Sequence, residues 1–299
     1  MSNPGEADAT PITASRQLAA WFEAGCKPRD AFRIGTEHES FGFRLGDHAP
    51  PAYLSQAGSG GIRDLLEGIA ANEGLDPILD RGQPIGLNGQ GFSISLEPGG
   101  QFELSGAPLA SLHETKAEID AHLDRIARIA PGLGLGFAPL GFHPTARRED
   151  FDWMPKGRYA IMRAHMPRVG TRGLDMMLRT CTVQANLDFA SEADMVRKMR
   201  VGYALQPLAT ALFANSPFRE GKPDGMLSNR AWTWLDTDNA RAGIPSAVFE
   251  DGFGFERYAD YLLDVPMYFV YRDGAYVDVA GRSFRDFMAG RLAGFEGQV

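Results

Sequence analysis

The stretch AFRIGTEHESFGFRL, residues 31–45, decides the fold prediction because two kinds of side chain alternate along it. Successive residues of a β-strand point to opposite faces of the sheet, so alternation over this length is typical of a strand. The alternation places Glu37 and Glu39 together on one face and His38 on the other. We therefore predict a β-strand here that projects two carboxylates to the same side.

Other segments predict further strands. GFSISLE and QFELSG, within residues 85–105, are joined by PGG at 98–100, a turn sequence typical of hairpins. TCTVQANLDF, residues 180–189, alternates strictly between polar and apolar side chains. The glycine-rich apolar segment 132–144 predicts a buried strand. The sheet is therefore expected to include at least these segments beside residues 31–45.

Five segments are expected to form helices, and they cover residues 14–24, 62–74, 111–130, 191–215 and 255–264. Two of them begin with capping boxes, in which Ser111 pairs with Glu114 and Ser191 pairs with Asp194. Pro207 is expected to kink the helix that it interrupts.

The helix over 111–130 is expected to bury one apolar stripe, made of Leu112, Ile119, Leu123, Ile126 and Ala130. Residues 151–175 are rich in Met, Arg, Pro and Gly without clean periodicity. We expect them to form mostly loop with one helical turn.

Composition limits the class of protein. The chain has 299 residues, of which 44% are apolar, so it has ample material for a hydrophobic core. A net charge of −8 argues against nucleic acid as a partner. We expect a flexible lead-in over 1–13 and a single domain over 14–299.

Two cysteines, Cys26 and Cys181, are too few for a disulfide framework in a chain of this length. The N-terminal residues lack a secretory signal pattern, and no apolar run approaches the roughly 20 residues of a membrane span. The sequence therefore predicts a cytoplasmic protein with no membrane partner. Cys181 falls on the apolar face of its strand, which favours a buried structural thiol over a nucleophile.

On three of the predicted strands, polar or acidic side chains share one face. The first strand carries Glu37 and Glu39. The second carries Gln101 and Glu103, with Glu97 just across the turn, and the third carries Gln184, Asn186 and Asp188. Two carboxylates at this spacing repel each other unless solvent or a positive group screens them. Solvent could account for any one pair. The repetition over three strands favours Mg²⁺, which takes carboxylate and amide oxygens.

Basic residues form a second group, in which six cations fall within 24 residues: Lys156, Arg158, Arg163, Arg168, Arg172 and Arg179. Arg230 and Arg241 follow near tryptophans. A solvated basic face and an anion pocket are both open interpretations, since the guanidinium fork matches carboxylate and phosphate oxygens. Carboxylates and arginines together suggest phosphoryl chemistry on a carboxylate.

Five segments identify a known family, and they are RIGTEHESFGF, SLEPGGQFELSG, MPKGRYAIMR, GLDMMLRTCTVQANLDF with the following SEADM, and LQPLATALFANSPF. Together they closely resemble glutamate–cysteine ligase of the plant type, which some bacteria also carry. The resemblance extends from about Trp21 to Phe269.

This resemblance implies ATP-dependent joining of the glutamate γ-carboxylate to the cysteine amine, the first step of glutathione biosynthesis. Glutamate, cysteine and ATP are then the expected partners, and Mg²⁺ is the expected cofactor. It also implies an α+β, glutamine-synthetase-like catalytic fold. In that fold a curved, mainly antiparallel sheet holds metals and substrates on its concave face, and helices pack outside.

Site residues are expected as two groups. The Mg²⁺ ligands, which should converge on one concave face, are Glu37, Glu39, Glu97, Glu103 and, less surely, Gln184. By resemblance, Arg158 and Arg230 are the candidate catalytic residues and bind glutamate or phosphate oxygens, while Trp234 and Tyr268 shape the substrate pocket.

Members of this family continue beyond the point that matches Val299, so a C-terminally truncated form is expected. Three alternatives stay open at this point. The chain could join glutamate to a different amine, act as a non-catalytic amino-acid or metal-binding module, or hydrolyse glycosides with two carboxylates across a sugar cleft. The sequence leaves the oligomeric state open.

Overall fold

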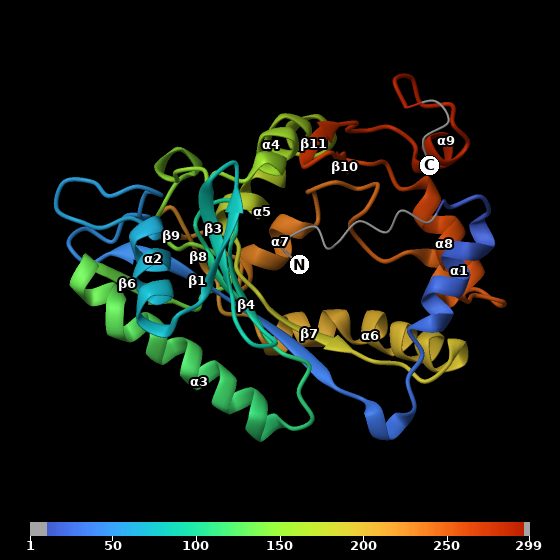
Figure 1. Cartoon of the computed structure of the whole chain (residues 1–299), viewed down its shortest axis with the longest axis horizontal. Coiled ribbons are helices and arrows are strands. Elements are labelled where there is room, and N and C mark those ends of the chain that lie inside the picture. Colours follow the sequence, from blue (N-terminus) through green and yellow to red (C-terminus); the bar gives the residue numbers. More distant parts are fainter. Residues whose placement is uncertain (1–10, 296–299) are drawn as a thin grey trace.

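The computed structural model describes residues 11–295 and is built on a seven-stranded sheet in which neighbouring strands are antiparallel (Figure 1). The strands are β1 (Ile34–Arg44), β2 (Asp76–Asp80), β3 (Gln83–Asn88), β4 (Ser93–Leu96), β5 (Phe102–Ser105), β6 (Leu135–Ala138) and β7 (Val183–Leu187). Their order is β2-β3-β4-β5-β1-β6, and β7 also pairs with β1. The predictions of strands over 31–45, 85–105, 132–144 and 180–189 are confirmed.

Nine α-helices lie among the described residues, and they are α1 (Ser15–Ala24), α2 (Ile62–Glu73), α3 (Leu112–Ile129), α4 (Gly157–Val169), α5 (Gly173–Arg179), α6 (Glu192–Leu212), α7 (Asn229–Trp234), α8 (Phe255–Asp264) and α9 (Phe284–Met288). Two short hairpins lie outside the main sheet, and they are β8 (Phe218–Arg219) with β9 (Lys222–Pro223) and β10 (Phe269–Arg272) with β11 (Ala275–Asp278). This combination of antiparallel sheet and helices confirms the α+β prediction.

The main core lies between the sheet and the helices beside it. Helix α2 contributes Ile62, Leu65, Leu66 and Ile69, which are fully buried. Figure 1 shows α2 and α3 on one side of the sheet and α5 and α7 on the other. The alternation of β1 therefore sends its odd-numbered and even-numbered side chains into two different environments.

The even-numbered His38 faces α3, where the charge of Glu118 acts on it. The odd-numbered Glu39 faces the α5 and α7 side, where it lines a cavity. The prediction that Glu39 and His38 point to opposite faces is thus confirmed by their surroundings.

Capping of the long helices follows the sequence. The Ser111 hydroxyl accepts a hydrogen bond from the Glu114 N–H, and the Ser191 hydroxyl accepts one from the Asp194 N–H. Pro207 lies inside α6, as expected. The described chain contains no helix that combines the length and apolar character needed to cross a membrane.

The predicted apolar stripe of α3 is wrong in part. Leu112 and Leu123 are exposed, whereas His122 and Ile126 are buried, and Ala130 follows the helix as a buried residue. The buried arc is set by where the helix meets the sheet, and there the His122 ring stacks on Phe102. A pattern based on apolar residues alone cannot predict that a histidine occupies a core position.

The prediction of loop over 151–175 is wrong, because α4 and α5 occupy much of it. Tyr159, Met162 and Met166 are spaced three and four residues apart, which is the spacing of one helix face. The basic residues and two prolines around them obscure this pattern in the sequence. Two of these, Tyr159 and Met166, are buried in the main core and Met162 packs against it. Burial in the core therefore stabilises a helix that the composition of the segment did not predict.

The hairpin of β2 and β3 has no counterpart in the prediction. Its two-residue turn places Arg81 and Gly82 at positive φ, of 49° and 77°, as a tight hairpin with the native strand twist requires. The expected lead-in over 1–13 lies mostly outside the described residues, so the domain division stays a prediction.

Candidate active site

A cavity of about 400 Å³ opens on the α5 and α7 side of the sheet, and we call it the central cavity. Seven of the nine predicted site residues line it, and they are Glu39, Glu97, Arg158, Gln184, Arg230, Trp234 and Tyr268. They come from β1, the β4–β5 turn, α4, β7, α7 and the segment before β10. The structure thus brings together residues that are up to 229 positions apart in the chain.

Strand pairing holds Glu39 in place. The Glu39 N–H donates to the Thr182 carbonyl at 3.1 Å, and the Thr182 N–H donates to the Glu39 carboxylate at 2.9 Å. Glu39 also lies opposite Glu103 across the β1–β5 pairing. The carboxylate is therefore fixed by backbone on one side and faces like charge on the other.

A tight turn presents Glu97 to the central cavity. The Glu97 carbonyl accepts from the Gly100 N–H at 2.9 Å, and Gly100 has φ of 81°, which glycine adopts without strain. The buried Gln101 side chain accepts from the Gly99 N–H and donates to the Met177 and Thr180 carbonyls. Gln101 thereby ties this turn to the end of α5.

Two of the predicted metal ligands do not line the cavity. Glu103 is buried and accepts hydrogen bonds from the hydroxyls of Ser95 and Ser105, at 2.9 and 2.8 Å. Glu37 lies farther along β1 and accepts from the Asn186 amide at 3.1 Å. The Asn186 amide in turn accepts from Gln184, so Glu37 is linked to the cavity through two side chains.

The acidic side of the cavity carries strongly shifted pKa values. Burial, followed by the charges of Glu97 and Glu103, raises the pKa of Glu39 to about 8. Burial also raises the pKa of Glu97, and the positive charge of Lys156 acts against that rise. Three carboxylates of neighbouring strands therefore share a region in which full ionisation is costly.

Two arginines face these carboxylates. The Arg230 Nε donates to the Cys181 carbonyl at 2.9 Å, which leaves the rest of its guanidinium directed at the cavity, and its charge acts on Glu39. Arg158 lies in the first turn of α4 and its charge acts on Glu97. Positive and negative groups thus line the same small volume.

Tyr268 is held rigidly in the cavity wall. Its hydroxyl donates to Asp238 at 3.0 Å, and the Arg241 guanidinium stacks 3.6 Å from the centre of its ring. Arg241 also binds Asp238 at 2.7 Å, which closes a trio of side chains. Trp234 is 40% exposed, and its ring lies 6.0 Å from the Arg230 guanidinium carbon.

Lys156 does not line the central cavity, but its charge acts on Glu97, and the sequence analysis did not single it out from its basic cluster. It is 3% exposed, its Nζ has no hydrogen-bond partner, and burial lowers its pKa. Tyr159 lies beside it and donates to the Leu96 carbonyl at 2.9 Å. The MPKGRY segment was visible in the sequence, but the burial of one of its cations depends on tertiary packing.

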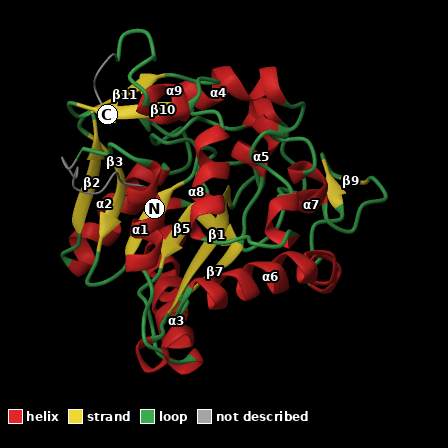
Figure 2. Ribbon diagram, turned by 90° about the vertical axis from the view of Figure 1, so that its right-hand side faces the viewer, coloured by secondary structure: helices red, strands yellow, loops and turns green. Residues whose placement is uncertain are grey.

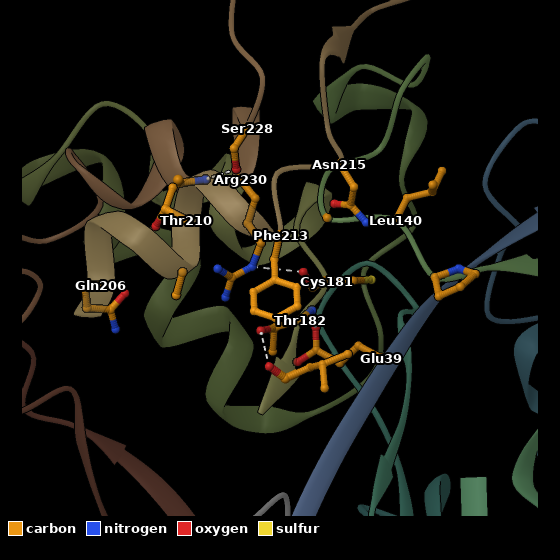
Figure 3. A pocket seen from close by; sticks show the side chains of 15 residues that line it. Glu39, Leu140, Cys181, Thr182, Gln206, Thr210, Phe213, Asn215, Ser228 and Arg230 are labelled. Carbon is orange, nitrogen blue, oxygen red and sulfur yellow. Dashed lines mark hydrogen bonds between the residues drawn. The ribbon is translucent and has the colours of Figure 1, made fainter. Parts of the chain in front are cut away.

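A second cavity of about 510 Å³ adjoins the first, and we call it the side cavity (Figure 3). The two share Glu39, Thr182 and Arg230, so these residues form a common wall. Cys181 lines the side cavity, but burial raises its pKa well above the usual value. The thiol therefore stays protonated, as its interpretation as a structural residue predicts.

Residues 11–295 hold no ready-made group of three His, Cys, Asp or Glu side chains around one metal position. The oxygens of Glu39, Glu97 and Gln184 nevertheless line the same cavity. Such carboxylate and amide oxygens are the ligands that Mg²⁺ takes, and a divalent cation would offset the repulsion of the carboxylates. The donor set therefore fits Mg²⁺.

Comparison with known proteins gives close relatives over 97% of the chain. Identity is 55% over 291 residues to the chloroplastic glutamate–cysteine ligase of Arabidopsis thaliana, and 56% over 289 residues to that of Nicotiana tabacum. It is 55% over 289 residues to ligase A of Oryza sativa subsp. japonica. The matched parts are 55%, 54% and 57% of these proteins, so the chain spans about half the length of its relatives.

These names correct the prediction of a cytoplasmic protein. All three relatives are named as chloroplastic, and the prediction rested only on cysteine usage and on a missing secretory signal pattern. Neither observation distinguishes one reducing compartment from another.

The family assignment rests on a longer match than any single motif. The family model described as "Glutamate-cysteine ligase family 2 (GCS2)" matches residues 33–292, which include every residue of both cavities. The chain belongs to glutamate–cysteine ligase family 2.

Proposed function

We propose that this chain carries the catalytic site of an ATP-dependent ligase that joins the glutamate γ-carboxylate to the cysteine amine. The observation that carries the proposal is the meeting of Glu39 and Glu97 with Arg158 and Arg230 in one cavity. The names of the relatives supply the substrates glutamate and cysteine. The cavity supplies the acidic and basic groups that phosphoryl transfer needs.

The arginines bind the anionic parts of the substrates. Arg230 offers the guanidinium nitrogens that its bond to the Cys181 carbonyl leaves over, and Arg158 approaches from α4. Each presents a planar fork to carboxylate or phosphate oxygens. Tyr268 and Trp234 bound the same volume and restrict how the substrate lies.

Mg²⁺ would be held by Glu39, Glu97 and Gln184, which line the cavity. Glu103 acts on these two carboxylates from behind the cavity wall. Glu37 lies opposite Gln184 across the β1–β7 pairing, and its carboxylate accepts from the Asn186 amide that in turn accepts from Gln184, so Glu37 positions that ligand. When bound, the ion would neutralise charge on the phosphate oxygens of ATP.

The chemistry proceeds in two substitutions. A free carboxylate acylates poorly, because oxide would have to leave, so the γ-carboxylate first attacks the terminal phosphate of ATP and ADP departs. The product is γ-glutamyl phosphate. The deprotonated cysteine amine then attacks its acyl carbon, the C–O bond to phosphate breaks, and phosphate leaves. Arg158 and Arg230 stabilise the charge that builds on the transferring oxygens.

A phosphate-release assay on the purified chain tests this proposal, with glutamate, cysteine, ATP or Mg²⁺ omitted in turn. We expect release to require all four components. Equal release with another amine in place of cysteine would assign the chain to a ligase with a different acceptor. Failure of glutamate to stimulate release, together with no calorimetric binding of glutamate and Mg²⁺-ATP, would contradict the proposal.

A further inference from the structure

Asp238 is a buried carboxylate that stands behind the wall of the central cavity. It is 1% exposed and does not line the cavity. The backbone that leads to it is tied down at two places. The hydroxyl of Thr237 donates to the Thr233 carbonyl of α7 at 3.0 Å. The carbonyl of Asp236 accepts from the N–H of Arg172, at the start of α5, at 3.0 Å.

The two helices that hold this segment also pack on each other. Both views place α5 beside α7 (Figures 1 and 2). Gly170 lies shortly before α5, and a Cβ atom there would stand 2.3 Å from the Thr237 carbonyl oxygen. Glycine therefore permits a close approach of backbone that any other residue would prevent. Asp238 is thus anchored to a base formed by two packed helices.

Arg241 connects this anchored carboxylate to the segment before β10. Its Nε donates to the Asp238 carboxylate at 2.7 Å, and its Nη2 donates to the Pro266 carbonyl. The guanidinium carbon lies 3.6 Å from the centre of the Tyr268 ring. Arg241 does not line the central cavity either. Its contacts with the substrate volume therefore pass through Tyr268, which does line the cavity.

The Tyr268 hydroxyl is occupied by the same carboxylate. It donates to Asp238 at 3.0 Å, and the buried His165 ring packs edge-on against the tyrosine ring, with 5.4 Å between the centroids. Burial raises the pKa of Tyr268 above its ordinary value, so the hydroxyl stays protonated. Tyr268 therefore presents its ring to the cavity, while its hydroxyl proton is held by Asp238.

We infer that Asp238 and Arg241 are positioning residues, which fix the orientation of the Tyr268 ring and act on a bound substrate only through that ring. This inference rests on the proposed function, because it requires that a substrate occupies the central cavity. A side chain that is already fixed loses no rotamer freedom when a substrate binds against it. Loss of the link is therefore expected to weaken binding more than it slows the chemical step.

Arg241→Met tests the link by kinetics, because it removes both hydrogen bonds and the planar stack. We expect kcat/KM for glutamate and cysteine to fall at least 10-fold in total, mainly through KM. Arg257→Met is the matched control, since Arg257 also bonds a carboxylate and a backbone carbonyl but lies on α8. The control is expected to keep wild-type kinetics.

Combination with Tyr268→Ala shows whether Arg241 acts through the ring. If it does, adding Arg241→Met to Tyr268→Ala changes kcat/KM by less than twofold, because the group that Arg241 positions is already absent. Multiplication of the two single effects would show that Arg241 acts by another route, and it would overturn the inference.

A second variant avoids an unpaired buried charge. Arg241→Met leaves the Asp238 carboxylate without its cation, which is costly at a buried position. Asp238→Asn combined with Arg241→Gln removes both charges together and still loses the guanidinium stack. We expect the same rise in KM from this pair of substitutions. Wild-type KM in the folded double variant would overturn the inference.

Crystal structures separate this inference from the proposed function. Tyr268 is expected to leave its single position in the Asp238→Asn, Arg241→Gln variant and to keep it in Arg257→Met. If the wild-type chain neither binds glutamate nor releases phosphate, the proposed function fails, and the structures still decide whether the two residues position the ring. A Tyr268 ring that is unmoved in the double variant would overturn the inference.

Discussion

Glu39 and Thr182 bind each other twice, once through backbone and once through the Glu39 carboxylate. This double link fixes a carboxylate whose pKa is raised to about 8 by burial and by neighbouring carboxylates. The geometry of the site is therefore maintained against an electrostatic cost. A substitution that removes only the charge separates the two effects.

Glu39→Gln is expected to lower kcat of the proposed ligase by about 100-fold, because it removes a charged Mg²⁺ ligand. Stability at pH 7 is expected to change by less than about 1 kcal/mol, since the amide oxygen still accepts from Thr182 and a carboxyl with a pKa of about 8 is already mostly uncharged at that pH. Steady-state kinetics measure kcat, and urea unfolding measures the free energy of unfolding. Loss of stability with full activity would show that Glu39 serves the fold alone.

Arg230→Lys keeps the charge but loses the planar fork and the Nε bond to the Cys181 carbonyl. We expect a 10- to 100-fold fall in kcat/KM for glutamate, equivalent to about 1.4 to 2.7 kcal/mol of transition-state stabilisation. Arg168→Lys on the exposed end of α4 is the control. Wild-type kinetics for Arg230→Lys would show that Arg230 does not bind the substrate.

Isotope transfer examines the proposed intermediate. Oxygen-18 in the γ-carboxylate of glutamate is expected to appear in the released phosphate, because the carboxylate oxygen that attacks ATP leaves with the phosphoryl group. Mass spectrometry of the phosphate measures it. Label found wholly in the peptide product would exclude γ-glutamyl phosphate.

His122 is expected to make stability depend on pH. It is buried, neither ring nitrogen has a hydrogen-bond partner, and burial lowers its pKa to about 4 from 6.5. The unfolded state therefore binds more protons between pH 6.5 and 4, so the free energy of unfolding falls as pH falls through that range. The loss attributable to His122 is about 3 kcal/mol when complete.

Urea unfolding at pH 7 and at pH 4.5 measures this loss. His122→Leu is expected to reduce the pH-dependent part, because a neutral side chain of similar size has no proton to take up. His113→Leu on the exposed face of α3 should leave the pH dependence unchanged. The same pH dependence in wild type and His122→Leu would contradict the assignment.

Local sequence determined β1 and the helix starts well, because alternation and capping act within a few residues. It failed where burial is decided by distant segments. His122 is buried because α3 meets Phe102 there, and Leu123 is exposed for the same reason. The helix α4 forms despite Pro167 because Tyr159 and Met166 enter the core.

In the candidate site, too, local sequence predicted some features and contacts between distant segments decided others. Residue type and strand alternation placed Glu39, and the resemblance added Arg158 and Arg230, all of which line the central cavity. The burial of Glu103 behind Ser95 and the isolation of the Lys156 Nζ come from packing between strands and α4. No periodicity in the sequence carries that information.

The wall shared by the two cavities makes their ligands thermodynamically dependent on each other. The same Arg230 guanidinium lines both cavities, and its charge and the charges of Glu97 and Glu103 act together on Glu39. A ligand that attracts Arg230 from one side changes the affinity of the other side. Linkage requires the effect to be reciprocal, so the order in which two ligands bind cannot alter the total free energy.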